Sequence, residues 1–103
     1  MESFAVYLAH FAAGVFLANG VPHFVNGVSG RAFPTPFATP PGRGKSPPLV
    51  NTLWGWFNFV AGFCLLFGVG HFTPQPSLDA LCLALGGLSI SLTLAWYFGK
   101  VNR

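Results

Sequence analysis

Charged side chains are scarce in this chain, and acidic ones are almost missing. Only 7% of the 103 residues are charged, comprising five Lys or Arg and two Asp or Glu, against about 25% in a typical soluble domain. A soluble fold of this length needs a polar surface, so this composition excludes an ordinary water-soluble domain. The formal net charge of +3 is too small and too localised to indicate a nucleic-acid-binding protein.

Side chains that perform chemistry are equally few. The sequence has no Ser–His–Asp set, no carboxylate pair and no nucleophile beside a base, so we expect no enzymatic activity and no cofactor. Two alternatives stay open. His10 and His71 are possible axial ligands of a haem iron. Cys64 and Cys82 are either a redox pair or, as is common for buried cysteines, two small apolar residues.

Three long apolar segments make up most of the chain. They span residues 4–28, 49–72 and 78–99, and each exceeds the roughly 20 residues that cross a bilayer as a helix. The first segment lacks the positively charged start of a signal peptide, so we interpret it as a retained helix. The sequence therefore predicts an all-α fold, a three-helix integral membrane bundle that forms one domain over residues 1–103.

The segment between the first two spans, residues 29–48, is rich in proline and glycine. Its six prolines exclude a regular helix, and we expect an irregular loop or a partner-docking segment. Residues 42–46 resemble the end of a phosphate-binding loop. However, Thr39 stands where that motif needs a small residue, and prolines flank it on both sides. We therefore expect no nucleotide binding.

Basic residues all fall on one side of the predicted bundle. With three spans, the first connection and the C-terminus share a side, and together they carry Arg31, Arg43, Lys45, Lys100 and Arg103. The positive-inside rule makes that side cytoplasmic, so the N-terminus is expected outside and the C-terminus inside. An aromatic belt of Trp54, Trp56, Trp96 and Tyr97 is predicted at the same interface. We expect a multi-pass protein of the cell inner (cytoplasmic) membrane.

Polar residues inside the first two spans lie on matching faces. They are Asn19, His23 and Asn26, spaced i, i+4, i+7, and Asn51 and Asn58, spaced i, i+7. In an antiparallel hairpin, residues at equal height have a constant sum of numbers, and both Asn19 with Asn58 and Asn26 with Asn51 give 77. We predict these two amide pairs across the interface, with His23 at the level of Trp54 and Gly55. The stripe serves either as packing contacts or as a small polar site.

The third span has its own expected features. Ser77 is a predicted N-cap, and Asp79 in the first turn favours the positive end of the helix dipole. A stripe of small residues is predicted to pack closely against the hairpin or another copy of the chain. It consists of Cys82, Gly86, Ser89 and Thr93.

Part of the chain resembles a group of small uncharacterised bacterial inner-membrane proteins. The resemblance rests on residues 20–38 (GVPHFVNGVSGRAFPTPFA), residues 41–44 (PGRG), Asn51 and the Trp54-Gly55 pair. It implies a bacterial cytoplasmic-membrane location and nothing about mechanism. The start of the chain also resembles the first helix of DoxX-like membrane proteins. That family usually has four spans and this chain has three, so no residue role is carried over.

Three functions are compatible with these features. The first is a small non-enzymatic subunit or assembly factor of a larger membrane complex. The second is an oligomeric transporter or channel that uses the Asn/His stripe, and the third is a haem- or quinone-associated redox protein. The expected partners are the lipid bilayer and another membrane protein or a second copy of the chain.

Overall fold

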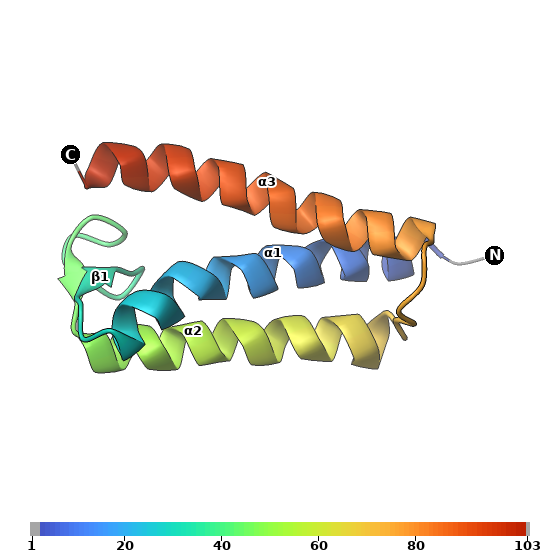
Figure 1. The fold of residues 1–103 in the computed structure, drawn as a ribbon, viewed down its shortest axis with the longest axis horizontal. Helices are drawn as coiled ribbons and strands as arrows, with labels where there is room; N and C mark the ends of the chain where they lie inside the picture. The colour runs from blue at the N-terminus through green and yellow to red at the C-terminus, as the bar shows by residue number, and fades with distance from the viewer. Residues whose placement is uncertain (1–2, 103) are drawn as a thin grey trace.

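The computed structural model describes residues 3–102 as an elongated molecule with extents of 45 × 23 × 20 Å. Its long helices run nearly side by side (Figure 1). In chain order the elements are α1 (Phe4–Val28), β1 (Phe33–Pro34), β2 (Lys45–Ser46), α2 (Pro48–Phe63), the π-helix η1 (Cys64–Val69) and α3 (Leu78–Val101). Three stretches, α1, α2 continued by η1, and α3, are long and apolar enough to cross a membrane. The predicted all-α class is confirmed.

The helix bounds agree closely with those expected, and the differences have local causes. α1 matches residues 4–28 and α3 begins at 78 as predicted. The second helical stretch ends at Val69 instead of 72, because His71 adopts a left-handed backbone (φ 51°) and the Phe72 amide turns back to the Leu66 carbonyl. Ser77 caps α3 as predicted, accepting a 3.1 Å hydrogen bond from the Ala80 amide.

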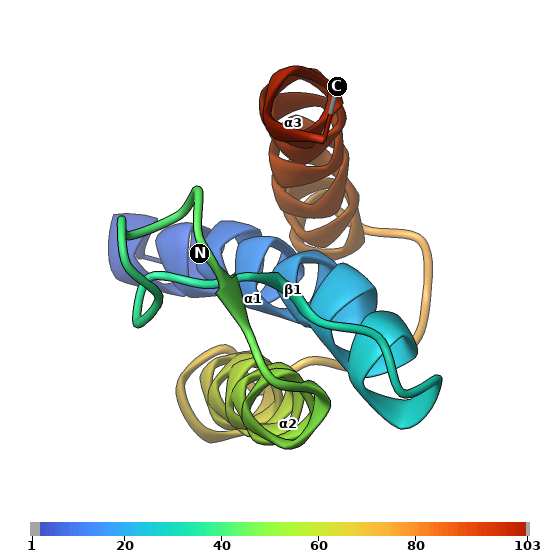
Figure 2. The same ribbon diagram turned by 90° about the vertical axis from the view of Figure 1, so that its left-hand side faces the viewer.

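The three helices do not form a closed triangle. α1 packs against both α2 and α3, which lie on opposite sides of it and have little contact with each other within residues 3–102 (Figure 2). The β1–β2 loop and the end of α3 lie at one end of the molecule. The start of α1 and the α2–α3 connection lie at the other (Figure 1).

Glycines allow α1 to approach both neighbours closely. A Cβ on Gly86 of α3 would collide with the Phe11 carbonyl of α1, and one on Gly20 of α1 would lie 2.9 Å from the Gly55 carbonyl of α2. Two members of the predicted small-residue stripe, Ser89 and Thr93, are exposed instead. Ser89 lies about 60° around the helix from Gly86 and Thr93 about 20°, at about 100° per residue. Both follow Gly86 along α3, which diverges from α1 toward its C-terminal end (Figure 1).

Burial in this molecule is reversed relative to a soluble protein. The buried hydrophobic side chains of the described residues are only Ala9, Ala13 and Leu66, while most large apolar side chains point outward. The interior is instead built from polar side chains and glycines. The buried polar residues are His10, His23, Thr35, Ser46, Asn51 and Asn58. This distribution suits a chain whose solvent is apolar.

Candidate functional site

Asn51, in the first turn of α2, is the centre of a buried hydrogen-bond network. Its side-chain nitrogen lies 3.0 Å from the Phe33 carbonyl, 3.1 Å from the Ser46 carbonyl and 3.3 Å from the Pro47 carbonyl. Carbonyl oxygens only accept, so this environment orients the amide nitrogen toward the loop. The Asn51 Oδ1 atom then faces His23 of α1 at 2.9 Å from its Nδ1 atom. One fully buried amide thus joins the loop, α1 and α2.

The orientation of Asn51 also determines the tautomer of His23. Because Asn51 Oδ1 is an acceptor, His23 Nδ1 must carry the hydrogen, and in the neutral ring Nε2 keeps a free lone pair. His23 is buried, with 3% of the residue exposed. The rings of Phe33, Trp54 and Phe98 meet it edge-on at centroid distances of 5.4, 6.4 and 6.3 Å.

A second polar contact between α1 and α2, this time between two amides, lies farther from the loop. The Asn58 side-chain nitrogen donates to the Trp54 carbonyl at 2.8 Å, which leaves its Oδ1 to accept from the Asn19 side-chain nitrogen at 3.0 Å. The predicted Asn19–Asn58 contact is therefore confirmed. His23 also lies at the level of Trp54, as expected.

The predicted contact between Asn26 and Asn51 is wrong. The Asn26 side-chain nitrogen donates to the Pro22 carbonyl one turn back, at 2.8 Å, and its oxygen accepts from Arg31 at 3.1 Å. The two asparagines are at equal height, but the loop and His23 already satisfy Asn51. Asn26 consequently bonds locally, as side chains of this type often do in helices.

The proline-rich loop folds back onto the bundle. β1 and β2 pair antiparallel, and the hydroxyls of Thr35 and Ser46 share a buried hydrogen bond of 2.5 Å. The Tyr97 hydroxyl of α3 donates to the Gly42 carbonyl at 2.8 Å, which ties the loop to the third helix. The segment is thus an ordered cap on one end of the helices, with short paired strands in place of the expected irregular loop.

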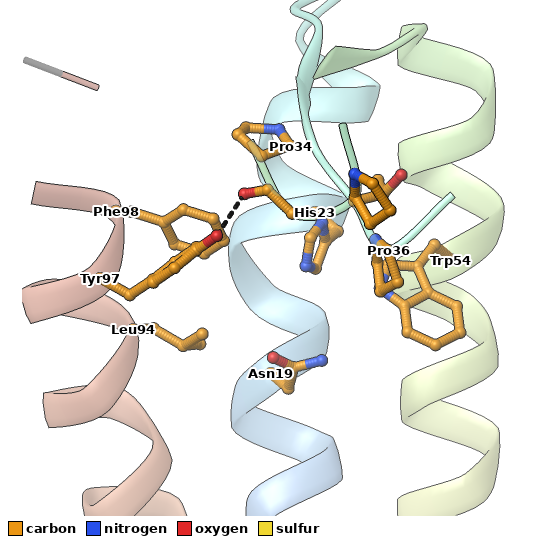
Figure 3. A pocket seen from close by; sticks show the side chains of 11 residues that line it. Asn19, His23, Pro34, Pro36, Trp54, Leu94, Tyr97 and Phe98 are labelled. Carbon is orange, nitrogen blue, oxygen red and sulfur yellow. Dashed lines mark hydrogen bonds between the residues drawn. The ribbon is translucent and has the colours of Figure 1, made fainter. Parts of the chain in front are cut away.

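A pocket of about 360 Å³ lies between the three helices and this cap (Figure 3). His23 and Asn19 of α1 lie on its floor, Trp54 of α2 on one side, and Tyr97 and Phe98 of α3 on the other. Its remaining lining residues are small or apolar, namely Pro34, Thr35, Pro36, Pro41, Gly42 and Leu94. The pocket therefore presents a few polar atoms within a mostly apolar wall, as small-molecule sites commonly do.

Sequence reasoning missed a second buried polar contact at the opposite end. His10 is fully buried; its Nδ1 donates to the Val6 carbonyl at 2.8 Å, and its Nε2 lies 3.9 Å from Asp79 Oδ2 of α3. Phe72 and Gly70 close over the imidazole. A proton on either Nε2 or the carboxylate makes this contact attractive. The sequence did carry a signal for this contact: Asp79 near the start of the third span and His10 near the start of the first lie at the same end of an antiparallel bundle.

The remaining candidate residues have exposed or half-buried side chains. His71 is exposed in the α2–α3 connection, and Cys64 and Cys82 are free thiols, the first exposed and the second half-buried. Four predicted cytoplasmic basic residues lie at the loop end, on the loop or near the end of α3. They are Arg31, Arg43, Lys45 and Lys100. Arg103 lies outside the described residues.

Comparisons with known proteins add no family to this description. No family model, curated protein or solved structure matches the chain.

The Asn51→Leu substitution tests the network at its centre. It leaves the loop carbonyls and the His23 Nδ1–H group buried without partners, so we expect the free energy of unfolding to fall by about 3 kcal/mol. Titration of the detergent-solubilised protein with SDS, followed by circular dichroism, measures this loss. Trypsin should also cleave faster after Arg43 and Lys45, because the loop is released from α2.

Asn26→Leu is the matched control, since its bonds are local or exposed. It should change the free energy of unfolding by less than about 1 kcal/mol. Equal losses for the two variants, or a loop that stays protease-resistant in Asn51→Leu, would contradict the assigned role of Asn51.

Proposed function

We propose that this chain is a multi-pass protein of the bacterial inner membrane. Three helices of sufficient length and apolarity support the proposal, together with the reversed burial described above. In water, side chains such as Phe4 at 78% exposure and Leu49 at 70% would be costly, whereas lipid solvates them. The side chains of Asn19, Asn51 and Asn58 and the Nδ1 atoms of His10 and His23 form hydrogen bonds within the bundle, which lowers the cost of placing them in an apolar solvent.

The proposed orientation has the loop and the C-terminus in the cytoplasm. The basic residues at the loop end support it, because the opposite α2–α3 connection carries no lysine or arginine. The aromatic residues at the loop end, such as Trp96, are also suited to the membrane–water interface. Lys100 lies 4.3 Å above the Trp96 ring, an arrangement that keeps a long cationic side chain and an aromatic ring together near the head groups.

Within the membrane, we assign the chain the role of a non-enzymatic subunit or assembly factor of a larger complex. The observation that carries this assignment is a stripe of exposed leucines along α3, here called the leucine stripe. The residues recur at spacings of three and four, the pattern of a helix that packs against another helix. They are Leu78, Leu81, Leu85, Leu88 and Leu92.

The leucine stripe faces away from the rest of the molecule. Its helix contacts α1 through the opposite side, where Gly86 and Gly87 approach the α1 backbone. Beside the stripe, the Ser91 hydroxyl donates to the Gly87 carbonyl at 2.6 Å, so this small residue adds no unpaired donor to the surface. Close van der Waals packing is what drives association of helices in lipid, and a regular leucine ridge with small flanking residues provides it.

Thiol labelling in intact cells tests the orientation. In a Cys64→Ala/Cys82→Ala background, a membrane-impermeant maleimide should label Gln75→Cys directly, because the α2–α3 connection is outside. The same reagent should label Thr39→Cys only after the membrane is permeabilised. The reverse pattern would overturn the orientation, and labelling of both positions in intact cells would contradict membrane insertion as proposed.

Photo-crosslinking in native membranes tests the subunit role. A benzophenone amino acid replaces Leu88 of the stripe, and a matched variant carries it at Val60 of α2, since the two side chains are 54% and 55% exposed. We expect a discrete crosslinked product from position 88 alone, which mass spectrometry identifies as another membrane protein or a second copy. The product should weaken when Leu85 and Leu92 are changed to Ala. No discrete product, or the same products from both positions, would contradict the proposal.

A further inference from the structure

We propose that the pocket beneath the loop binds a neutral single-chain lipid whose head group carries hydroxyl groups and an ester carbonyl, as in a monoacylglycerol. This inference concerns a different surface from the leucine stripe and does not rest on the subunit role. It follows from unpaired polar atoms on three residues that line an otherwise apolar pocket.

Two of these atoms are hydrogen-bond acceptors on α1. His23 Nε2 keeps its lone pair because Asn51 takes the hydrogen on Nδ1. Asn19 uses its side-chain nitrogen to bond Asn58, so its Oδ1 atom is left without a donor among residues 3–102. One helical turn separates the two residues, and both line the pocket (Figure 3). Together they provide acceptors for two hydroxyl groups of one ligand.

The third free atom is a donor on α2. Trp54 lines the pocket, and its Nε1–H group finds no partner in the described part of the chain. Protein atoms cover this group, so a ligand reaches it when the side chains around the indole shift. A buried N–H group without a partner carries a desolvation cost that a bound acceptor would remove. An ester carbonyl next to the two hydroxyls is such an acceptor, and it has no hydrogen to compete for the sites on α1.

Charge and depth favour a neutral head group. No Lys, Arg, Asp or Glu is among the described residues that line the pocket, so a phosphate or carboxylate there would be a buried unpaired charge. His23 is five residues before the end of α1 at Val28, about 7.5 Å along the axis at about 1.5 Å per residue. In the proposed orientation this is near the interface, where the glycerol and ester groups of lipids lie.

A second pocket is available for the acyl chain of the lipid. A volume of about 360 Å³ suits a head group and not a whole lipid. A second pocket of about 530 Å³ shares Trp54 with the first and is lined otherwise by apolar side chains of α2 and the loop. These are Phe37, Val50, Leu53 and Phe57. The indole therefore separates a polar head-group site from an apolar surface that faces the membrane.

Native mass spectrometry of the full chain tests the proposal with three probes that share one hydrocarbon chain. The protein is held in lauryldimethylamine oxide, a detergent without hydroxyl groups. Monoolein supplies two hydroxyls and an ester, methyl oleate supplies the ester alone, and oleate carries a negative charge. We expect one monoolein per chain, with binding at least tenfold tighter than that of methyl oleate or oleate.

Two variants locate the binding to this pocket. Trp54→Phe removes the free N–H without breaking a hydrogen bond of the protein, so monoolein affinity should fall about threefold to tenfold. Trp96→Phe is the matched control and should leave the affinity unchanged, because Trp96 is an exposed residue outside the pocket. Leu94→Trp places a larger ring at the pocket wall and should abolish binding while the circular dichroism spectrum is retained.

Several results would overturn the assignment. Equal binding of monoolein and methyl oleate would mean that only the hydrocarbon chain is recognised. Preferred binding of oleate would mean that the site takes an anion. Unchanged monoolein affinity in both Trp54→Phe and Leu94→Trp would place the binding elsewhere on the protein.

Discussion

The buried amide of Asn51 is the constraint on which the rest of the structure depends. Leaving a buried polar group unpaired is costly, and Asn51 pairs with the loop on one side and with His23 on the other. The loop is thereby held over the ends of the helices, and the imidazole is held in one tautomer. Asn51 thus positions the loop that roofs the pocket and leaves His23 Nε2 as one of its two free acceptors.

The two faces of α3 show how one apolar helix can make two kinds of contact. Gly86 and Gly87 approach the α1 backbone, and the hydroxyls of Ser91 and Thr93 donate to carbonyls of α3 itself. The leucine stripe points outward at regular spacing. At the end far from the loop, His10 of α1 and Asp79 of α3 form a polar contact. Close glycine contacts hold both neighbours of α1. Two polar contacts, His23–Asn51 and Asn19–Asn58, join α1 to α2, and the His10–Asp79 contact joins α1 to α3 at the opposite end.

Much of this arrangement could be predicted from the sequence. The length of the apolar segments indicates the helices, and in an antiparallel hairpin the residues at equal height have a constant sum of residue numbers. The Asn19–Asn58 contact followed from such reasoning. The hydrogen bonds of Asn26 could not be predicted, because they depend on whether Asn51 already has other partners. Those partners include loop carbonyls, and the sequence pattern does not determine the path of that loop. The contact of His10 with Asp79 depends on how α3 crosses α1, which helical periodicity alone leaves open.

The most direct test of this account is the tautomer of His23, measured by ¹⁵N NMR of the histidine side chains in detergent micelles at neutral pH. Correlations from the ring carbons distinguish a hydrogen on Nδ1 from one on Nε2. If Asn51 Oδ1 accepts from His23 as described, the ring carries its hydrogen on Nδ1 and its Nε2 atom is unprotonated. A hydrogen on Nε2, or rapid exchange between the two forms as in a solvent-exposed histidine, would contradict the central role of Asn51.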